Sequence, residues 1–176
     1  MKISRIREVL GSYRPHLLEY ERGVEASVLV PFIQSDEDLY IVLIKRTQEV
    51  GVHKGEVSFP GGVRKEIDST PLETALRECY EEIGVRGDDV EVLGMMDEER
   101  TTTGFVIRPY VGLIPGPYEF VLNAKEVAYL LLLPIQHLGL VEFDEEASFV
   151  FEGERIWGAT GRILKNLARI LGLRND

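Results

Sequence analysis

Cysteine is nearly absent from this sequence, and so are long apolar runs. Among its 176 residues only Cys79 is a cysteine, so an internal disulfide is excluded and a reducing, cytoplasmic location is expected. No apolar run approaches the roughly 20 residues of a membrane-spanning helix, so we expect no membrane insertion. The amino-terminal segment alternates charged and apolar residues, which is unlike the apolar centre of a secretory signal.

Positive charge is also scarce. The sequence has 20 Lys and Arg against 30 Asp and Glu, a formal net charge of −10. Because binding to a phosphate backbone requires a basic face, this balance argues against nucleic acid as a partner. A small phosphorylated substrate remains compatible, since carboxylates bind divalent cations and the cations then bind phosphates. The oligomeric state is left open, with a homodimer as one option.

The patterns that are present favour one α+β domain. Helices are expected at residues 3–10, 71–83 and 159–171. Strands are expected at residues 26–33, 39–46, 90–97, 106–114 and 126–133, with a hairpin at 147–158. A short strand is also expected within residues 56–62, where it ends in Pro-Gly-Gly. We expect residues 1–24 to form a helix and lead-in, and residues 25–172 to form the main domain. An α/β/α sandwich, a mixed sheet with helices on both sides, fits this order.

The second helix has clear limits. Thr70 is the expected N-cap, Pro71 suits the first helical position, and Glu73 completes a capping box. Gly84 predicts the end of the helix. The predicted buried stripe of this helix consists of Leu72, Ala75, Leu76, Cys79 and Ile83.

Glu78, Glu81 and Glu82 fall outside that stripe and lie side by side on the helix. Each like-charged pair at this spacing costs about 0.2–0.5 kcal/mol. Neighbouring glutamates are usually only a solvated face, but the preceding Pro-Gly-Gly allows a tight turn beside them. Carboxylate and carbonyl oxygens are the ligands that Mg²⁺ takes, so the sequence predicts a cation site. Arg77 can pair with Glu81 four residues later.

The segment from Gly62 to Val85 resembles the Nudix box: Gly, five residues, an acid, seven residues, then Arg-Glu-apolar-x-Glu-Glu-x-Gly-apolar. Its second half is complete, while one extra residue in the first half makes Asp68 the best substitute for the first acid. The resemblance implies the Nudix fold and a hydrolase of nucleoside diphosphates linked to a group X, using Mg²⁺ or Mn²⁺. It implies metal ligands at Gly62, Glu78, Glu81 and Glu82, and catalytic roles for Arg77, Glu81 and Glu82.

The stretch "LIKRTQEVGVHKGEVSFPGG" is similar to the coenzyme A diphosphatase subfamily, although that subfamily usually has Arg at the position of Gly51. Residues 101–114 and 156–164 also resemble it. The resemblance implies cleavage of coenzyme A or acyl-coenzyme A to 3′,5′-ADP and 4′-phosphopantetheine, with substrate contacts from Arg46, His53 and Lys54. The alternatives are an ADP-ribose or NADH-type dinucleotide pyrophosphatase and a non-catalytic Nudix-fold binding module.

For several further residues the sequence predicts a role less specifically. Some Nudix enzymes place a catalytic Glu outside the box, and Glu126 or the acidic loop at 142–146 could supply it. Phe59 and Trp157 are expected in the core, because aromatic residues dominate core burial. Arg162, at the start of the last helix, is expected to form a structural salt bridge.

Overall fold

The structure is a computed structural model that describes residues 1–19, 22–49 and 53–174, so Gly51 lies outside the described residues. Its helices are α1 (Ile3–Ser12), α2 (Pro71–Ile83) and α3 (Gly158–Ile170), with two 3₁₀ helices, η1 (Gly87–Asp89) and η2 (Ile135–Gly139). Its strands are β1 (Val24–Ser35), β2 (Asp38–Arg46), β3 (Val57–Ser58), β4 (Gly61–Val63), β5 (Glu91–Met95), β6 (Glu99–Arg100), β7 (Phe105–Ile114), β8 (Val127–Pro134), β9 (Phe149–Phe151) and β10 (Glu154–Ile156).

Strand β1 organises the mixed sheet. It runs parallel to β7 and antiparallel to β2, and β2 pairs on its other side with β8. The antiparallel β1–β2 pair turns at residues 36–37, between the strands predicted at 26–33 and 39–46. Parallel neighbours require a crossover connection, and the chain between β1 and β7 includes α2.

The short strand predicted before the Pro-Gly-Gly is β3, and a second strand, β4, which was not predicted, begins at the first of the two glycines. β3 pairs with β2, whereas β4 pairs with β1. Phe59 and Pro60 separate the two, and the Pro60 carbonyl accepts a hydrogen bond from the Leu29 amide at 2.9 Å. Proline lacks an N–H group, so the segment changes partner at this point.

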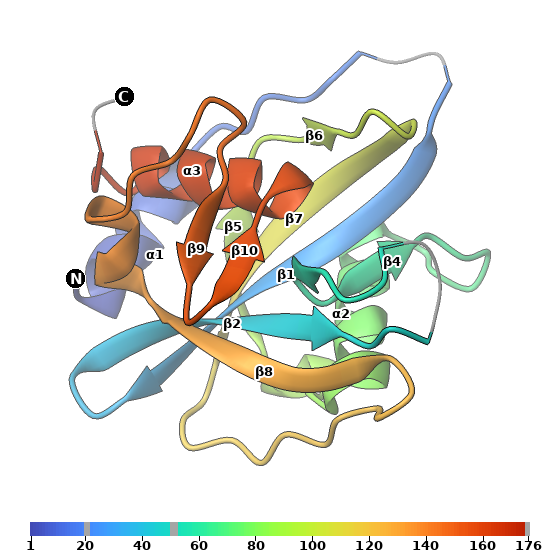
Figure 1. Ribbon diagram of the computed structural model, residues 1–176, viewed down its shortest axis with the longest axis horizontal. Coiled ribbons are helices and arrows are strands. Elements are labelled where there is room, and N and C mark those ends of the chain that lie inside the picture. The colour runs from blue at the N-terminus through green and yellow to red at the C-terminus, as the bar shows by residue number, and fades with distance from the viewer. Residues whose placement is uncertain (20–21, 50–52, 175–176) are drawn as a thin grey trace.

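Helices cover both faces of the sheet, as predicted for an α/β/α sandwich (Figure 1). On one face α2 packs its buried Ala75, Cys79 and Ile83 against the sheet. On the other face the core includes residues of α1, α3 and the β9–β10 hairpin. Among the described residues no helix is long and apolar enough to cross a membrane.

The two aromatic residues expected in the core behave differently. Phe59 is 3% exposed, as predicted, but Trp157 is 43% exposed and that prediction is wrong. Ile156, the last residue of β10, is fully buried, and in extended backbone the next side chain points the opposite way. Arg162 forms the expected ion pair, with Glu99 as its partner.

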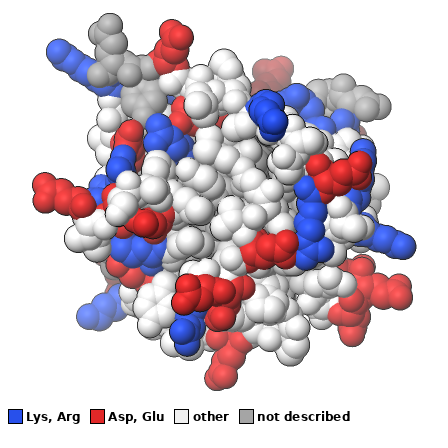
Figure 2. Space-filling view, turned by 180° about the vertical axis from the view of Figure 1, so that it is seen from behind, with Lys and Arg blue, Asp and Glu red and all other residues white. Residues whose placement is uncertain are grey.

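Seen from behind, acidic and basic side chains are interspersed around the rim of the molecule (Figure 2). Uncharged residues fill much of the centre of this face. This face therefore presents no concentration of one sign of charge.

Candidate active site

Local sequence determines where α2 begins and ends. The Thr70 hydroxyl accepts from the Glu73 amide, and the Glu73 carboxylate accepts from the Thr70 amide, so the predicted capping box is present. Gly84 has φ 75° and donates its amide to the Tyr80 carbonyl, which ends the helix. The rotation of the helix, and hence the placement of its glutamates, is then set by the apolar residues that pack on the sheet.

Glu82 does not lie on an exposed stripe, which corrects the sequence-based prediction. It is 2% exposed. Its Oε2 accepts from the Gly61 amide at 3.0 Å, and its Oε1 lies 3.4 Å from Arg46 Nη1. Burial raises the pKa of Glu82 to about 8, and the charges of Glu78 and Glu126 raise it as well, while Gly61 and Arg46 oppose the shift. The buried carboxylate is therefore a strong acceptor that lacks full charge compensation.

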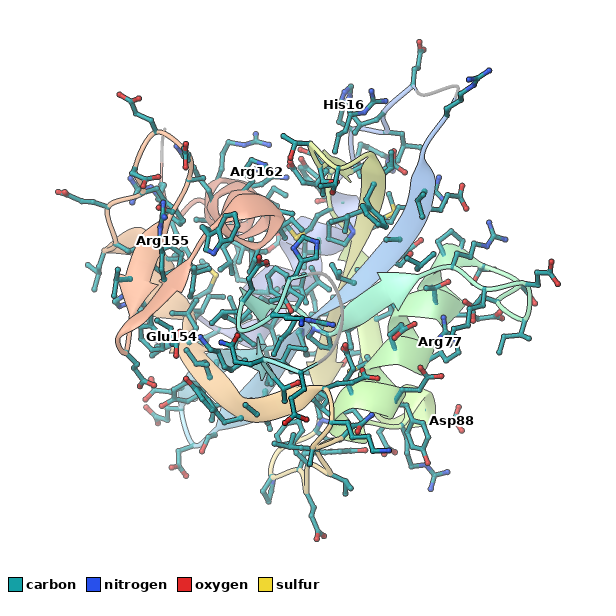
Figure 3. All side chains as sticks on the ribbon, turned by 45° about the vertical axis from the view of Figure 1, so that its right-hand side comes forward. His16, Arg77, Asp88, Glu154, Arg155 and Arg162 are labelled. Atoms are coloured by element: carbon teal, nitrogen blue, oxygen red, sulfur yellow. The ribbon has the colours of Figure 1, made fainter. Side chains whose placement is uncertain are left out.

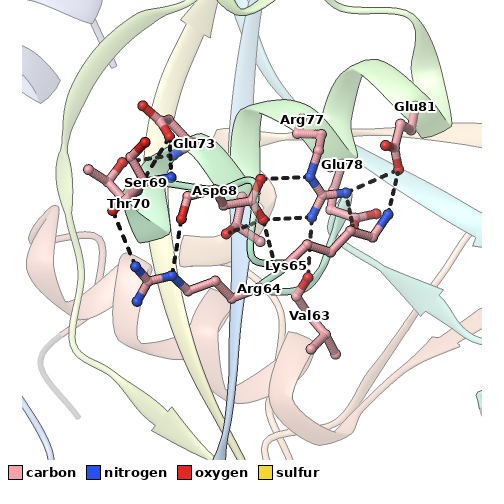
Figure 4. A network of polar contacts seen from close by, with 11 residues as sticks. Val63, Arg64, Lys65, Asp68, Ser69, Thr70, Glu73, Arg77, Glu78 and Glu81 are labelled. Carbon is pink, nitrogen blue, oxygen red and sulfur yellow. Dashed lines mark hydrogen bonds and ion pairs between the residues drawn. The ribbon is translucent and has the colours of Figure 1, made fainter.

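Arg77 connects the other acidic residues (Figure 4). Its Nη1 donates to Glu78 Oε1 at 2.7 Å and to Glu81 Oε2 at 3.2 Å, which confirms the predicted pairing with Glu81. Its Nη2 also donates to the Val63 carbonyl at 3.2 Å. Because the guanidinium is planar, one side chain holds two glutamates and the end of β4 in a defined arrangement.

Asp68 faces Arg77 from the loop before α2. It accepts from Arg77 Nε at 2.8 Å and from Nη2 at 2.9 Å. The Lys65 amide and the Thr74 hydroxyl complete its hydrogen bonds at 2.9 and 3.0 Å. The Arg77 hydrogen bond, together with these donors, holds the pKa of the buried carboxyl well below its usual range. Asp68 thus acts through Arg77, even though the loop has one extra residue.

Sequence reasoning missed Thr74, which is fully buried on α2. A signal was available, because Thr74 and Arg77 are three residues apart and so share one face of the helix. Their common partner is Asp68.

Gly61 and Gly62 allow the β4 turn to approach α2 and β1. A Cβ on Gly62 would lie 2.6 Å from the carboxyl carbon of Glu78, and one on Gly61 would lie 2.5 Å from the Ser27 carbonyl oxygen. Neither contact is sterically possible for another residue without movement of the backbone or of the carboxylate. The paired glycines therefore place a backbone turn directly against two glutamates.

The remaining predicted residues divide into two groups. Arg46 and Glu126 lie beside Glu82, since Arg46 contacts it and the charge of Glu126 acts on it. His53 instead pairs with Glu56 at 3.1 Å, and Lys54 is exposed. Within the part of the chain that the structure describes, no hydrogen bond or ion pair links His53 or Lys54 to the glutamates of α2.

The three glutamates of α2, Glu78, Glu81 and Glu82, have the chemistry of a site for a hard divalent cation. Its donors are carboxylate oxygens beside a glycine turn, and Mg²⁺ and Mn²⁺ prefer oxygen ligands. Among the described residues, however, no three His, Cys, Asp or Glu side chains already converge as a metal cluster. The reason is visible in the contacts: Arg77 holds Glu78 and Glu81, while Glu82 is bonded to Gly61.

Comparison with known proteins agrees with this geometry. A model of the NUDIX domain matches residues 23–157. The protein named Nudix hydrolase NudL from Yersinia enterocolitica is 34% identical over 157 residues, covering 82% of this chain and 80% of its own. Its counterpart of the same name from Pectobacterium atrosepticum is 31% identical over 166 residues, covering 88% and 86%.

Solved structures show the same fold at low sequence identity. A MutT/nudix family protein from Enterococcus faecalis has a TM-score of 0.61 at 17% identity, covering 98% of this chain and 70% of that one. The NUDIX domain of Shewanella oneidensis NrtR, solved in complex with ADP ribose, has a TM-score of 0.57 at 17% identity and covers 97% and 99%. The chain therefore belongs to the Nudix family and is a hydrolase that acts on pyrophosphate bonds.

Proposed function

We propose that the enzyme is a Mg²⁺- or Mn²⁺-dependent diphosphatase of nucleoside diphosphates linked to a group X, with coenzyme A or acyl-coenzyme A as the substrate. The observation that carries the metal-dependent chemistry is the buried Glu82, bonded to the Gly61 amide, with Glu78 against the adjacent Gly62. A buried carboxylate with its pKa raised to about 8 gains strongly from a nearby divalent cation.

The residues proposed to hold the metal are Glu78, Glu81, Glu82 and the backbone of Gly62. When bound, the metal polarises phosphoryl oxygens and lowers the pKa of a bound water. To coordinate a cation, Glu78 and Glu81 would give up part of their bonding to Arg77. The two hydrogen bonds from Arg77 to Asp68 come from Nε and Nη2, whereas Nη1 bonds to Glu78 and Glu81, so release of the glutamates would leave the Asp68 bonds in place.

Glu81, Glu82 and Glu126 are the candidates for the group that takes a proton from the attacking water. Glu81 is the most exposed of the three box glutamates, with a side chain 44% exposed, so it is open to solvent. Glu126 lies outside the box on the loop before β8, close enough to raise the pKa of Glu82. In the loop at 142–146, which holds the other candidates outside the box, Asp144 bonds to the loop amides and Glu146 pairs with Arg155. The charge of Glu126 acts directly on Glu82, so Glu126 is favoured.

Coenzyme A is favoured by the resemblance of residues 43–62 to the coenzyme A diphosphatases. Arg46 supports it structurally, because its Nε is buried without a hydrogen-bond partner among the described residues. A buried unpaired donor on a guanidinium beside Glu82 suits a phosphate oxygen. ADP-ribose is the second candidate, because the Shewanella domain that shares this fold was solved with that ligand.

The test is a side-by-side measurement of kcat/KM for coenzyme A, dephosphocoenzyme A, ADP-ribose and NADH at saturating Mg²⁺ and Mn²⁺, with products resolved by mass. We expect coenzyme A to be cleaved fastest, to 3′,5′-ADP and 4′-phosphopantetheine. Faster cleavage of ADP-ribose would reject coenzyme A as the substrate but would leave the proposal of metal-dependent diphosphate hydrolysis intact. Binding without turnover of any substrate would instead identify a binding module.

The metal site is tested by Glu78→Gln and Glu82→Gln. Each substitution should lower kcat by about 100-fold or more, because each removes a charge that acts on the transition state. Glu37→Gln is the matched control, since it removes one exposed carboxylate from the β1–β2 turn, which has no proposed role in the site. Normal turnover of both box variants would remove the metal-site assignment.

A further inference from the structure

Two neighbouring strands each end in a polar side-chain atom that is buried and has no hydrogen-bond partner among the described residues. These atoms are Nε of Arg46, the last residue of β2, and the hydroxyl of Ser58, the last residue of β3. A buried polar atom without a partner is unfavourable in a folded protein unless a water or a ligand supplies one. Both atoms therefore call for a partner from outside the described chain.

The strand register places the two side chains on one face of the sheet. β2 and β3 are antiparallel with Ile44 opposite Ser58, and the Arg46 amide donates to the Glu56 carbonyl at 2.9 Å, which continues that register. Arg46 and Ser58 are thus diagonal neighbours, a spacing that a long side chain spans. Ile44 belongs to the core that packs against α2, so this is the face that carries Glu82.

The alternation of side chains along β2 supports this placement. Lys45, which precedes Arg46, points to the other face of the sheet, where it pairs with Glu154 of β10. Figure 3 shows Glu154 and Arg77 of α2 on different sides of the ribbon. Successive side chains of a strand point to opposite faces, so Arg46 turns toward α2, and Ser58 turns with it.

Both strands lead to the buried carboxylate of the candidate active site. Arg46 Nη1 lies 3.4 Å from Glu82 Oε1, and the amide of Gly61, three residues after Ser58, donates to Glu82 Oε2 at 3.0 Å. The side chain of Arg46 is 21% exposed and Ser58 is half-buried, so both residues reach the surface in part. A ligand held at the α2 glutamates therefore lies next to these two donors.

The carboxylates nearest to the two donors are already engaged. Glu56, opposite Arg46 in the β2–β3 pair, contacts His53 Nδ1 at 3.1 Å. Glu82 accepts from Gly61 and has only a long contact with Arg46. An incoming acceptor can satisfy both buried donors. A phosphoryl oxygen is suited to this role, because it is negatively charged and accepts more than one hydrogen bond.

We propose that Ser58 is a further substrate-binding residue, whose hydroxyl donates to the phosphoryl oxygen that accepts from Nε of Arg46. This inference rests on the proposed function in one respect, namely that the diphosphate of the substrate reaches Arg46. It does not depend on coenzyme A, because coenzyme A, ADP-ribose and NADH all carry a diphosphate.

The experiment measures the binding of methylene diphosphonate, a diphosphate analogue in which a CH₂ group replaces the bridging oxygen and prevents hydrolysis. Its Mg²⁺ complex is titrated by calorimetry into the full chain. Ser58→Ala should bind it about tenfold more weakly than the wild type, because a hydrogen bond to a charged oxygen is lost. Ser58→Thr, which retains a hydroxyl, should restore most of the affinity.

Ser35→Ala is the matched control for this measurement. Ser35 is exposed at the end of β1, whereas β4 pairs with the opposite half of that strand. Its substitution should leave the affinity for the diphosphonate unchanged. Equal binding by the wild type and Ser58→Ala would overturn the proposal.

Arg46→Lys tests whether the two donors share one oxygen. Lysine keeps the positive charge and has a methylene group in place of Nε. If the oxygen is shared, the two substitutions are coupled, and the double variant should lose less affinity than the product of the two single losses. Losses that multiply independently would contradict a shared oxygen and overturn the proposal.

Thermal stability separates ligand binding from a structural role of the hydroxyl. In the metal-free protein this hydroxyl has no partner among the described residues, so Ser58→Ala should leave Tm unchanged or raise it. A buried water that bridges Ser58 and Arg46 predicts the reverse, a lower Tm with unchanged affinity for the diphosphonate. That result, or a wild type that does not bind the diphosphonate, would also reject the inference.

Failure of this inference is distinguishable from failure of the proposed function. The diphosphonate titration contains no coenzyme A, so a substrate panel in which ADP-ribose is cleaved fastest would reject coenzyme A and leave the Ser58 result valid. If coenzyme A is cleaved fastest and Ser58→Ala binds the diphosphonate like the wild type, the Ser58 contact is wrong and the proposed function stands.

Discussion

Asp68→Asn tests the inference that Asp68 organises the active site through Arg77. The substitution keeps the size of the side chain and removes its charge. It weakens two hydrogen bonds from Arg77, at 2.8 and 2.9 Å, to a carboxylate that is 5% exposed. Breaking one partner of a buried ion pair costs about 3–5 kcal/mol. In the variant Arg77 retains its ion pairs with Glu78 and Glu81. We therefore expect the loss in unfolding free energy to lie at the lower limit of this range, about 3 kcal/mol.

The assay is urea unfolding of the metal-free protein, supported by calorimetry. For a chain of this length 1 kcal/mol shifts Tm by about 2–4 °C, so the expected loss is about 6–12 °C. Glu66→Gln is the matched control, because Glu66 is an exposed acid in the same loop. Its effect should stay within about 0.5 kcal/mol, as for other surface substitutions.

The pH dependence supplies a second criterion with a definite sign. The folded pKa of Asp68 lies below its unfolded value, so the folded state binds fewer protons in that range. The stabilisation is complete above the unfolded pKa of about 3.9 and is lost as pH falls toward the folded pKa. The difference between wild type and Asp68→Asn should therefore be constant from pH 6 to 8, to the precision of about 10–15% in extrapolated unfolding free energies, and should shrink below about pH 4. A variant as stable as the wild type, or a difference that grows in acid, would refute the reasoning.

Two further predictions concern the residues that contact the glutamates. Arg77→Lys keeps the positive charge and loses the planar guanidinium. It should therefore lower kcat by about 10–100-fold with little change in KM. Steady-state kinetics in which KM alone rises would contradict this prediction. Glu82→Gln should raise the Tm of the metal-free protein, because burial opposes the charge of this carboxylate and Gln still accepts from Gly61. In calorimetry, added Mg²⁺ should then raise the Tm of the wild type and not that of the variant, and a large response of the variant would argue against Glu82 as a ligand.

Short-range features of the site were predictable from the sequence. Thr70, Pro71, Glu73 and Gly84 define the ends of α2, because capping interactions act within three or four residues. The pairing of Arg77 with Glu81 follows in the same way from helical spacing. The Nudix resemblance added the identity of the metal-ligand candidates, since its pattern specifies residue types at many positions.

Features that depend on distant segments were not predictable. Glu82 was expected outside the buried stripe of α2, because its helical position alone does not reveal that β4 approaches from 21 residues earlier in the chain and donates the Gly61 amide. Trp157 was expected in the core because it is large and apolar, yet Ile156 takes the inward position. The Pro-Gly-Gly within residues 56–62 reads as the end of a strand, but its glycines begin β4, which pairs with β1, while β3 before them pairs with β2.

The amino-acid sequence by itself thus determined the elements, the ends of α2 and the residue types of the acidic cluster, because hydrogen bonds and side-chain periodicity within a helix or strand act over a few residues. Only the tertiary structure decided which carboxylate is buried and which arginine holds each one. Those properties depend on desolvation and on donors from other strands, and both arise only when segments far apart in the sequence pack together.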